Sequence, residues 1–142
     1  MAGILLVTHN GLGDSLIDCV RHVLGQVPAN LLVLAVKAND DPARKEAEGR
    51  AVIEYMDKGE GVLLLADMFG ATPCNIGQRL CEIPNVAGIA GVNLPMLLRA
   101  VSNMDRPLDE LARMALDGGR DCIVPIDHEQ NEKCDAATGR AD

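Results

Sequence analysis

The sequence has almost no aromatic side chains. It contains no tryptophan, one phenylalanine and one tyrosine among 142 residues, although 48% of its residues are hydrophobic. The core must therefore be built from aliphatic side chains, which suits a parallel β-sheet packed between helices. A chain of this length can form one domain with a sizeable core, and we expect that domain to span residues 1–126.

Long hydrophobic runs and an excess of positive charge are also absent. No apolar stretch approaches the ~18 residues that a membrane-spanning helix needs, and the N-terminus has no basic region that would indicate a secretory signal. Thirteen Lys and Arg residues are outnumbered by 21 Asp and Glu, which gives a net charge of −8. Such a chain repels phosphate backbones and anionic lipids, so we expect a cytoplasmic protein without nucleic-acid binding or direct membrane insertion.

The cysteines form no recognisable metal or disulfide pattern. There are five, at positions 19, 74, 81, 122 and 134, and none belongs to a C-x-x-C pair. An odd number of scattered cysteines favours reduced side chains over a disulfide framework or a zinc site. We therefore expect no metal and no cofactor. Residues 127–142 contain no large apolar side chain, which indicates a disordered tail.

Four short apolar runs alternate with helical patterns along the chain. The first begins at Gly3 and brings His9 to its end; the others span residues 31–36, 62–66 and 86–90. Each run is continuous rather than alternating, which is typical of strands covered on both faces. The predicted fold is α/β, a flavodoxin-like open sheet of four parallel strands in the order 2-1-3-4 with helices on both faces.

Capping residues set the predicted ends of several helices. The first helix is expected to end near Gly25, and the second to begin with Asp41 as its cap and to end at Gly59. The last helix is expected to begin at Pro107 and to end at Gly118-Gly119. A short final strand is expected over residues 122–126. Six residues are predicted to form the inner face of the second helix: Ala43, Ala47, Ala51, Val52, Tyr55 and Met56.

His9 is the strongest candidate for chemistry. It ends a buried strand, and ligands of open α/β sheets bind outside the carboxyl ends of the strands. A neutral imidazole can act as a nucleophile, a base or a metal ligand near physiological pH. Taken alone, a structural histidine in a surface loop explains the position equally well. His22 and His128 are weaker candidates because neither has metal-ligand spacing to another histidine.

Asp67 and Thr72 lie where they can assist His9. Asp67 ends the third strand, which is the neighbour of the first in the predicted order, so its carboxylate can accept the Nδ1–H of His9 and leave Nε2 free. Thr72 precedes Pro73 at a predicted helix start, where a phosphoryl group would be stabilised. The alternative for Asp67 is a turn cap, and for Thr72 an ordinary helix cap.

Two further loops lie at the same predicted edge of the sheet. The first contains Met68 and Phe69, which can form an apolar lip facing a partner or anchor the loop in the core. The second follows the fourth strand, where Asn93, Pro95 and Met96 either line the pocket or only start a helix.

Taken together, these segments resemble the IIA component of the mannose (mannose–fructose–sorbose) family of the phosphoenolpyruvate-dependent sugar phosphotransferase system. The resemblance covers residues 3–126 and rests on the strand-one histidine, the loop Asp67-Met68-Phe69-Gly70-Ala71-Thr72-Pro73-Cys74-Asn75 and the segment Gly91-Val92-Asn93-Leu94-Pro95-Met96-Leu97, all in the family's order. Three motifs in register are more specific than any one of them.

The resemblance implies a phosphotransferase whose substrates are proteins. A histidine phosphocarrier protein would phosphorylate His9, which would pass the group to a IIB component for sugar uptake. Asp67 would orient the ring, and the Thr72 hydroxyl would bind the phosphoryl group. The resemblance also implies a homodimer in which residues 120–126 cross to the partner's sheet. Residues expected to contact the phosphoryl group or a partner are Asn10, Gly11, Phe69, Gly70, Ala71, Asn93, Pro95 and Met96.

The sequence departs from the family pattern at two positions. Asn10 follows the histidine where the family usually has glycine, so Asn10 must adopt a conformation that glycine adopts easily. Ala71 stands in Gly-Ala-Thr-Pro where Gly-Gly-Ser-Pro is common. These departures bear on the choice of partner rather than on the transfer chemistry.

Two other functions are compatible with the sequence. In one, phosphorylated His9 is a regulatory switch that a target protein detects, with no sugar permease downstream. In the other, the chain is an unrelated flavodoxin-like domain that binds a small molecule. The sequence contains neither a IIB segment nor a membrane span, so it does not distinguish a role in transport from a role in regulation.

Overall fold

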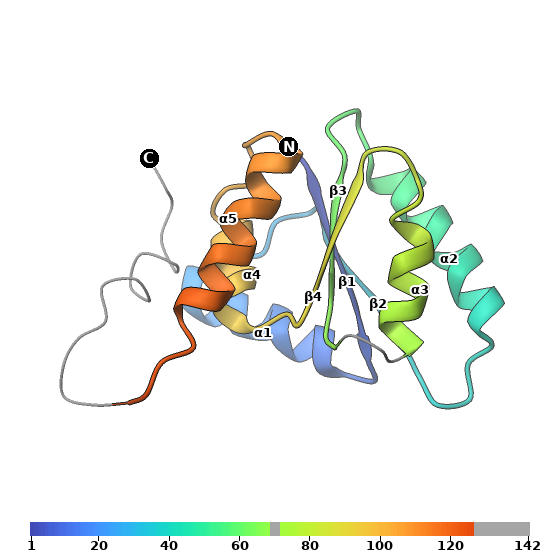
Figure 1. The fold of residues 1–142 in the computed structure, drawn as a ribbon, viewed down its shortest axis with the longest axis horizontal. Coiled ribbons are helices and arrows are strands. Elements are labelled where there is room, and N and C mark those ends of the chain that lie inside the picture. Colours follow the sequence, from blue (N-terminus) through green and yellow to red (C-terminus); the bar gives the residue numbers. More distant parts are fainter. Residues whose placement is uncertain (69–71, 127–142) are drawn as a thin grey trace.

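A parallel four-stranded sheet lies between two layers of helices (Figure 1). The computed structural model describes residues 1–68 and 72–126. The strands are β1 (Gly3–His9), β2 (Leu31–Val36), β3 (Val62–Ala66) and β4 (Val86–Ala90). They pair in the order β2-β1-β3-β4, and every pairing is parallel. The predicted fold class and strand order are thus confirmed.

Five helices connect and cover the strands. They are α1 (Leu12–Leu24), α2 (Pro42–Met56), α3 (Thr72–Leu80), α4 (Leu94–Val101) and α5 (Leu108–Asp121). Gly25 ends α1 in the left-handed conformation, at φ 84°, and the Asp41 side chain accepts the Ala43 N–H at the start of α2. Both predicted caps are confirmed. No helix within the described residues is both long and apolar enough to cross a membrane.

Alternation along the strands divides the core into two halves. Because successive strand side chains point to opposite faces, Ile4 and Leu6 of β1 pack with α1, α4 and α5, whereas Leu5 and Val7 pack with α2 and α3. Figure 1 shows these two helical layers on opposite sides of the sheet. His9 lies two residues beyond Val7, so its side chain belongs to the face that α2 and α3 cover.

The predicted inner face of α2 is largely wrong. Tyr55 is 69% exposed and the three alanines are exposed, whereas Gly49, Ile53 and Met56 are buried. Gly49 decides the orientation, because a Cβ there would lie 2.7 Å from Leu80 Cδ1. This glycine lets α2 approach α3 closely. The helix also ends at Met56 rather than Gly59, since Asp57 Oδ1 accepts the N–H groups of Gly59 and Gly61 and turns the chain.

The glycine pair in α5 does not stop the helix. α5 continues to Asp121, and both Gly118 and Gly119 are buried within it. A Cβ on Gly119 would lie 2.7 Å from Met96 Cε and 3.0 Å from Met96 Cβ. The glycine therefore permits a close approach of α5 to α4. The segment expected to cross to the partner, residues 120–126, begins too early, because residues 120 and 121 are helical. Residues 123–126 form no strand within this chain, and an exchange of residues 122–126 between subunits stays a prediction.

Replacing Gly119 with alanine is expected to destabilise the fold. In an exposed helix this change stabilises the helix by about 1 kcal/mol, because alanine has a higher helix propensity than glycine. Here the new methyl group must displace Met96, and such overpacking costs about 1–3 kcal/mol. We expect a net loss of up to about 2 kcal/mol in the free energy of unfolding, measured by urea denaturation. Asp117→Ala, at an exposed site on the same helix, is the control and should not destabilise. A Gly119→Ala variant more stable than wild type would contradict this packing.

Candidate functional site

His9 stands at the carboxyl end of β1, at the edge of the sheet. It is opposite Val36, the last residue of β2, in the parallel register. Its side chain is 43% exposed, so the ring is anchored at one side and open to solvent at the other. The sheet therefore presents an imidazole that a second protein can reach.

Asn10 makes the turn that follows His9. Its φ is 48°, in the left-handed region that non-glycine residues rarely enter, and its N–H donates to the Val36 carbonyl over 3.0 Å. Asparagine is among the residues that tolerate this conformation best. The expectation that Asn10 adopts a glycine-like conformation is confirmed, and Gly11 then begins α1 as its N-terminal cap residue.

Asp67 holds the imidazole through one carboxylate oxygen. Its Oδ2 lies 2.8 Å from His9 Nδ1 and also accepts the His9 backbone N–H over 2.9 Å, while Oδ1 accepts the Met68 N–H over 2.9 Å. The carboxylate side chain is only 9% exposed. Burial alone would raise the pKa of Asp67, but the hydrogen bonds and charge of His9, with the Met68 N–H, lower the pKa below its ordinary value of 3.8.

An ionised Asp67 selects the tautomer of His9. A carboxylate can only accept, so His9 Nδ1 must carry the hydrogen that bridges the two groups. In the neutral ring this leaves the lone pair on Nε2. The contact proposed from the strand order is thus present, and it has the geometry needed to make Nε2 the nucleophile.

A cavity of about 390 Å³ opens beside His9 on the α2 and α3 side of the sheet. Thr72, the first residue of α3, lines it, so the structure brings Thr72 and His9 to one site. Thr72 is exposed to solvent. The remaining lining residues are Asn10, Val36, Lys37, Ala38, Asp40 and Pro42.

The segment after β4 does not line this cavity. Met96 is 3% exposed and packs in the core with α4 and α5, so the expectation that its side chain contacts a partner is wrong for this chain. Asn93 caps α4 by accepting the Met96 N–H and donates to the Gly119 carbonyl. Pro95 is in the first turn of the same helix. These residues follow β4, two strands from β1, and α4 covers the opposite face of the sheet.

The structure describes only some of the other predicted residues. Phe69, Gly70 and Ala71 fall outside the described residues. Met68 is 53% exposed, which fits an apolar lip near Asp67. His22 is exposed on α1, as expected from its position, and His128 also falls outside the described residues.

Sequence reasoning missed the contribution of the loop after β2. Lys37, Ala38, Asp40 and Pro42 all line the His9 cavity. The signal was available, because the carboxyl ends of neighbouring parallel strands lie at one edge of the sheet. Within residues 1–68 and 72–126, no group of three or more His, Cys, Asp and Glu side chains has the arrangement of a metal site.

Comparison with known proteins shows which family the chain belongs to. A sequence model of the EIIA-man family, described as the PTS system fructose IIA component, matches residues 3–116. The chain belongs to this family. It is therefore a component of the sugar phosphotransferase system, and the alternative of an unrelated small-molecule-binding domain is excluded.

Individual relatives agree with this EIIA-man membership. The mannose-specific EIIAB component of Escherichia coli K12 is 26% identical over 141 residues, covering 97% of this chain and 43% of the relative. The chain thus spans less than half the length of that protein. Among solved structures, a mannose/sorbose-specific IIA subunit from Enterococcus faecalis superposes with a TM-score of 0.81 at 24% identity, covering 91% of this chain and 97% of that one. An EIIA component from Streptococcus agalactiae gives a TM-score of 0.75 at 21% identity, covering 88% and 97%.

Replacing Asp67 with asparagine is expected to remove an acid-dependent part of the stability. Because the folded-state pKa of Asp67 lies below 3.8, the unfolded chain takes up this proton first as the pH falls. The stabilisation is thus complete above about pH 5 and is lost as the pH falls through the folded-state pKa. We expect the free energy of unfolding of wild type to exceed that of Asp67→Asn by about 1–3 kcal/mol at pH 7. This difference should shrink between about pH 4 and pH 3.

Urea denaturation of both proteins from pH 7 to pH 3 measures this difference. A gap that stays constant over the whole range would contradict an ionised Asp67 bonded to His9.

Proposed function

We propose that this EIIA-man protein is a phosphoryl relay. His9 accepts a phosphoryl group from a histidine phosphocarrier protein and passes it to a IIB component for sugar uptake. The observation that carries the proposal is the 2.8 Å contact between Asp67 Oδ2 and His9 Nδ1, which leaves Nε2 available at an exposed site. The name of the Escherichia coli relative, an EIIAB component, supports a IIB unit as the acceptor.

Transfer to His9 exchanges one phosphorus–nitrogen bond for another. The Nε2 lone pair attacks phosphorus, the bond to the donor's histidine nitrogen breaks, and its electron pair returns to the donor ring. Nothing is oxidised or reduced. In the second transfer, a nucleophile of the IIB component attacks phosphorus, the bond to His9 Nε2 breaks, and its electron pair returns to the His9 ring, so the chain is regenerated.

Asp67 would act on charge as well as on orientation. While Nδ1 keeps its hydrogen, phosphorylation of Nε2 leaves the imidazole ring positively charged. The buried carboxylate at 2.8 Å offsets this charge, as the aspartate of a Ser-His-Asp triad does for its imidazolium. Asp67 therefore lowers the barrier without contacting the phosphoryl group.

Thr72 and the start of α3 would bind the phosphoryl oxygens. Thr72 lines the His9 cavity and begins a nine-residue helix, whose positive dipole end attracts anions. Asn10 and Gly11 are exposed beside His9, and Leu12 and Met68, 43% and 53% exposed, supply apolar contact area for partners. Partner proteins would therefore meet an apolar rim around a polar centre.

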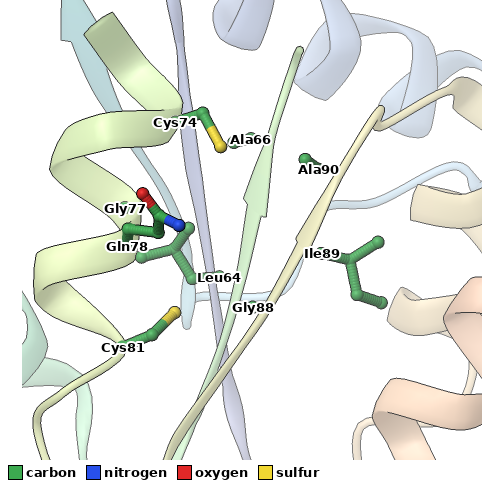
Figure 2. Close-up of a pocket in the computed structure, with 9 residues that line it drawn as sticks. All are labelled: Leu64, Ala66, Cys74, Gly77, Gln78, Cys81, Gly88, Ile89 and Ala90. Atoms are coloured by element: carbon green, nitrogen blue, oxygen red, sulfur yellow. The ribbon is translucent and has the colours of Figure 1, made fainter. Parts of the chain in front are cut away.

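A homodimer is part of the proposal. β4 is an edge strand of the described sheet, and its residues are only partly buried. Beside it, α3 and the sheet enclose a cavity of about 240 Å³ (Figure 2), with the Cys74 and Cys81 thiols on the helix side. Burial, assisted by Cys74, raises the pKa of the Cys81 thiol, so this thiol stays uncharged at neutral pH. An apolar strand from a second copy would fit this edge.

Phosphate labelling tests the relay. After incubation with phosphoenolpyruvate, the system's first enzyme and its phosphocarrier, wild type is expected to carry one acid-labile, alkali-stable phosphate, and His9→Ala none. His22→Ala, which removes an exposed histidine from α1, is the matched control and should label like wild type. Asp67→Asn is expected to label about 10–100-fold more slowly.

Unlabelled wild type, or undiminished label on His9→Ala, would refute the relay. Wild-type labelling rates for Asp67→Asn would remove Asp67 from its assigned role.

Light scattering tests the dimer. Ile123 and Ile126 are 75% and 102% exposed in the single chain, so we expect Ile123→Lys/Ile126→Lys, and a chain ending after Cys122, to be monomers while wild type is a dimer. This end point keeps α5 intact. Val23→Lys, at another exposed apolar site, is the control and should remain a dimer. Dimeric variants lacking the isoleucines would contradict strand exchange.

A further inference from the structure

We propose that the ammonium group of Lys37 binds the phosphoryl group on His9 and stabilises the phosphorylated state. This inference rests on the proposed relay, and it assigns a role to a residue in the loop after β2. Lys37 lines the same cavity as His9 and Thr72.

The sheet fixes where Lys37 begins. His9 pairs with Val36 in the last rung between β1 and β2, and the Asn10 N–H donates to the Val36 carbonyl. Lys37 is the next residue, so its backbone leaves the sheet one strand away from His9, at a spacing of about 4.8 Å between strands. Its N–H donates to Asp40 Oδ2 over 2.7 Å, which holds the start of the loop. The flexible four-carbon stem can then bring the ammonium over the cavity.

The charges around the cavity favour a cation at this position. Asp40 also lines the cavity, and its Oδ2 lies 3.8 Å from Lys45 Nζ. A carboxylate at this position repels a phosphoryl group, which carries a charge of about −2. Thr72 and the helix start offer hydrogen bonds and partial charges only. Lys37 is exposed, and no ion pair engages its ammonium anywhere in the part of the chain that the structure describes.

Lys37 is therefore expected to change the equilibrium between phosphorylated carrier and phosphorylated His9, and not only the rate of transfer. The ratio of phosphorylated His9 to phosphorylated carrier depends on how stable each phosphorylated protein is. A lysine that only helps the carrier to dock speeds transfer equally in both directions and leaves this ratio unchanged. A lysine that holds the phosphoryl group shifts the ratio.

The test measures that ratio at equilibrium with a limiting amount of labelled phosphocarrier. Lys37→Met is expected to lower the ratio about three- to tenfold, because a charged hydrogen bond is lost at a partly exposed site. Lys37→Arg keeps the charge and should stay within about twofold of wild type, and the deficit of Lys37→Met should shrink near 1 M salt as the charges are screened. Lys58→Met is the matched control: it removes an exposed lysine past the other end of α2 and should leave the ratio unchanged.

The outcomes separate this inference from the relay itself. Absence of label on wild type overturns the relay. Normal labelling of wild type with an unchanged ratio for Lys37→Met overturns the inference, and so does a change in the rate alone. A loss that Lys37→Arg does not rescue also overturns it, because the charge is then not the cause.

Discussion

The contact between Asp67 and His9 is the interaction on which the rest of the site depends. It joins the ends of two strands that are far apart in sequence and adjacent in the sheet, and it uses one oxygen for both the His9 ring and the His9 backbone. The same oxygen therefore fixes the position of the His9 ring and the position of the end of β1 relative to Asp67. Burying a carboxylate is costly unless it is paired, so this arrangement also favours the Nδ1–H tautomer of the neutral His9 ring while Asp67 is ionised.

Strand alternation decides which other groups reach His9. Because His9 and Val7 share a face, the ring is presented to α2 and α3, and Thr72, Pro42 and Lys37 line its cavity. The opposite layer contains Met96, which helps to join α4 to α5. The order of motifs along a chain does not show which of these layers a motif belongs to. Two motifs at the same edge of a sheet can still be separated by the sheet itself.

Much of the fold and part of the site could be predicted from the sequence. Continuous apolar runs marked all four strands, and Asp41 and Gly25 marked helix ends, because these signals are local. The face of α2 was not predictable in this way. Its alanines suit either environment, and only the approach of Leu80 to Gly49 settles which side is buried. The glycines of α5 misled for the same reason: they serve a tertiary contact.

The sequence by itself determined the α/β class, which follows from hydrophobic runs that alternate with helical patterns. A flavodoxin-like strand order then predicted that His9 and Asp67 can meet, because neighbouring parallel strands end at one edge. Only the tertiary structure decided which side chains at that edge complete the site. It brought Lys37 to His9 and took Met96 into the core, because the register of β2 on β1 and the packing of α5 on α4 are fixed by contacts between distant residues. Such contacts leave no local pattern in the chain.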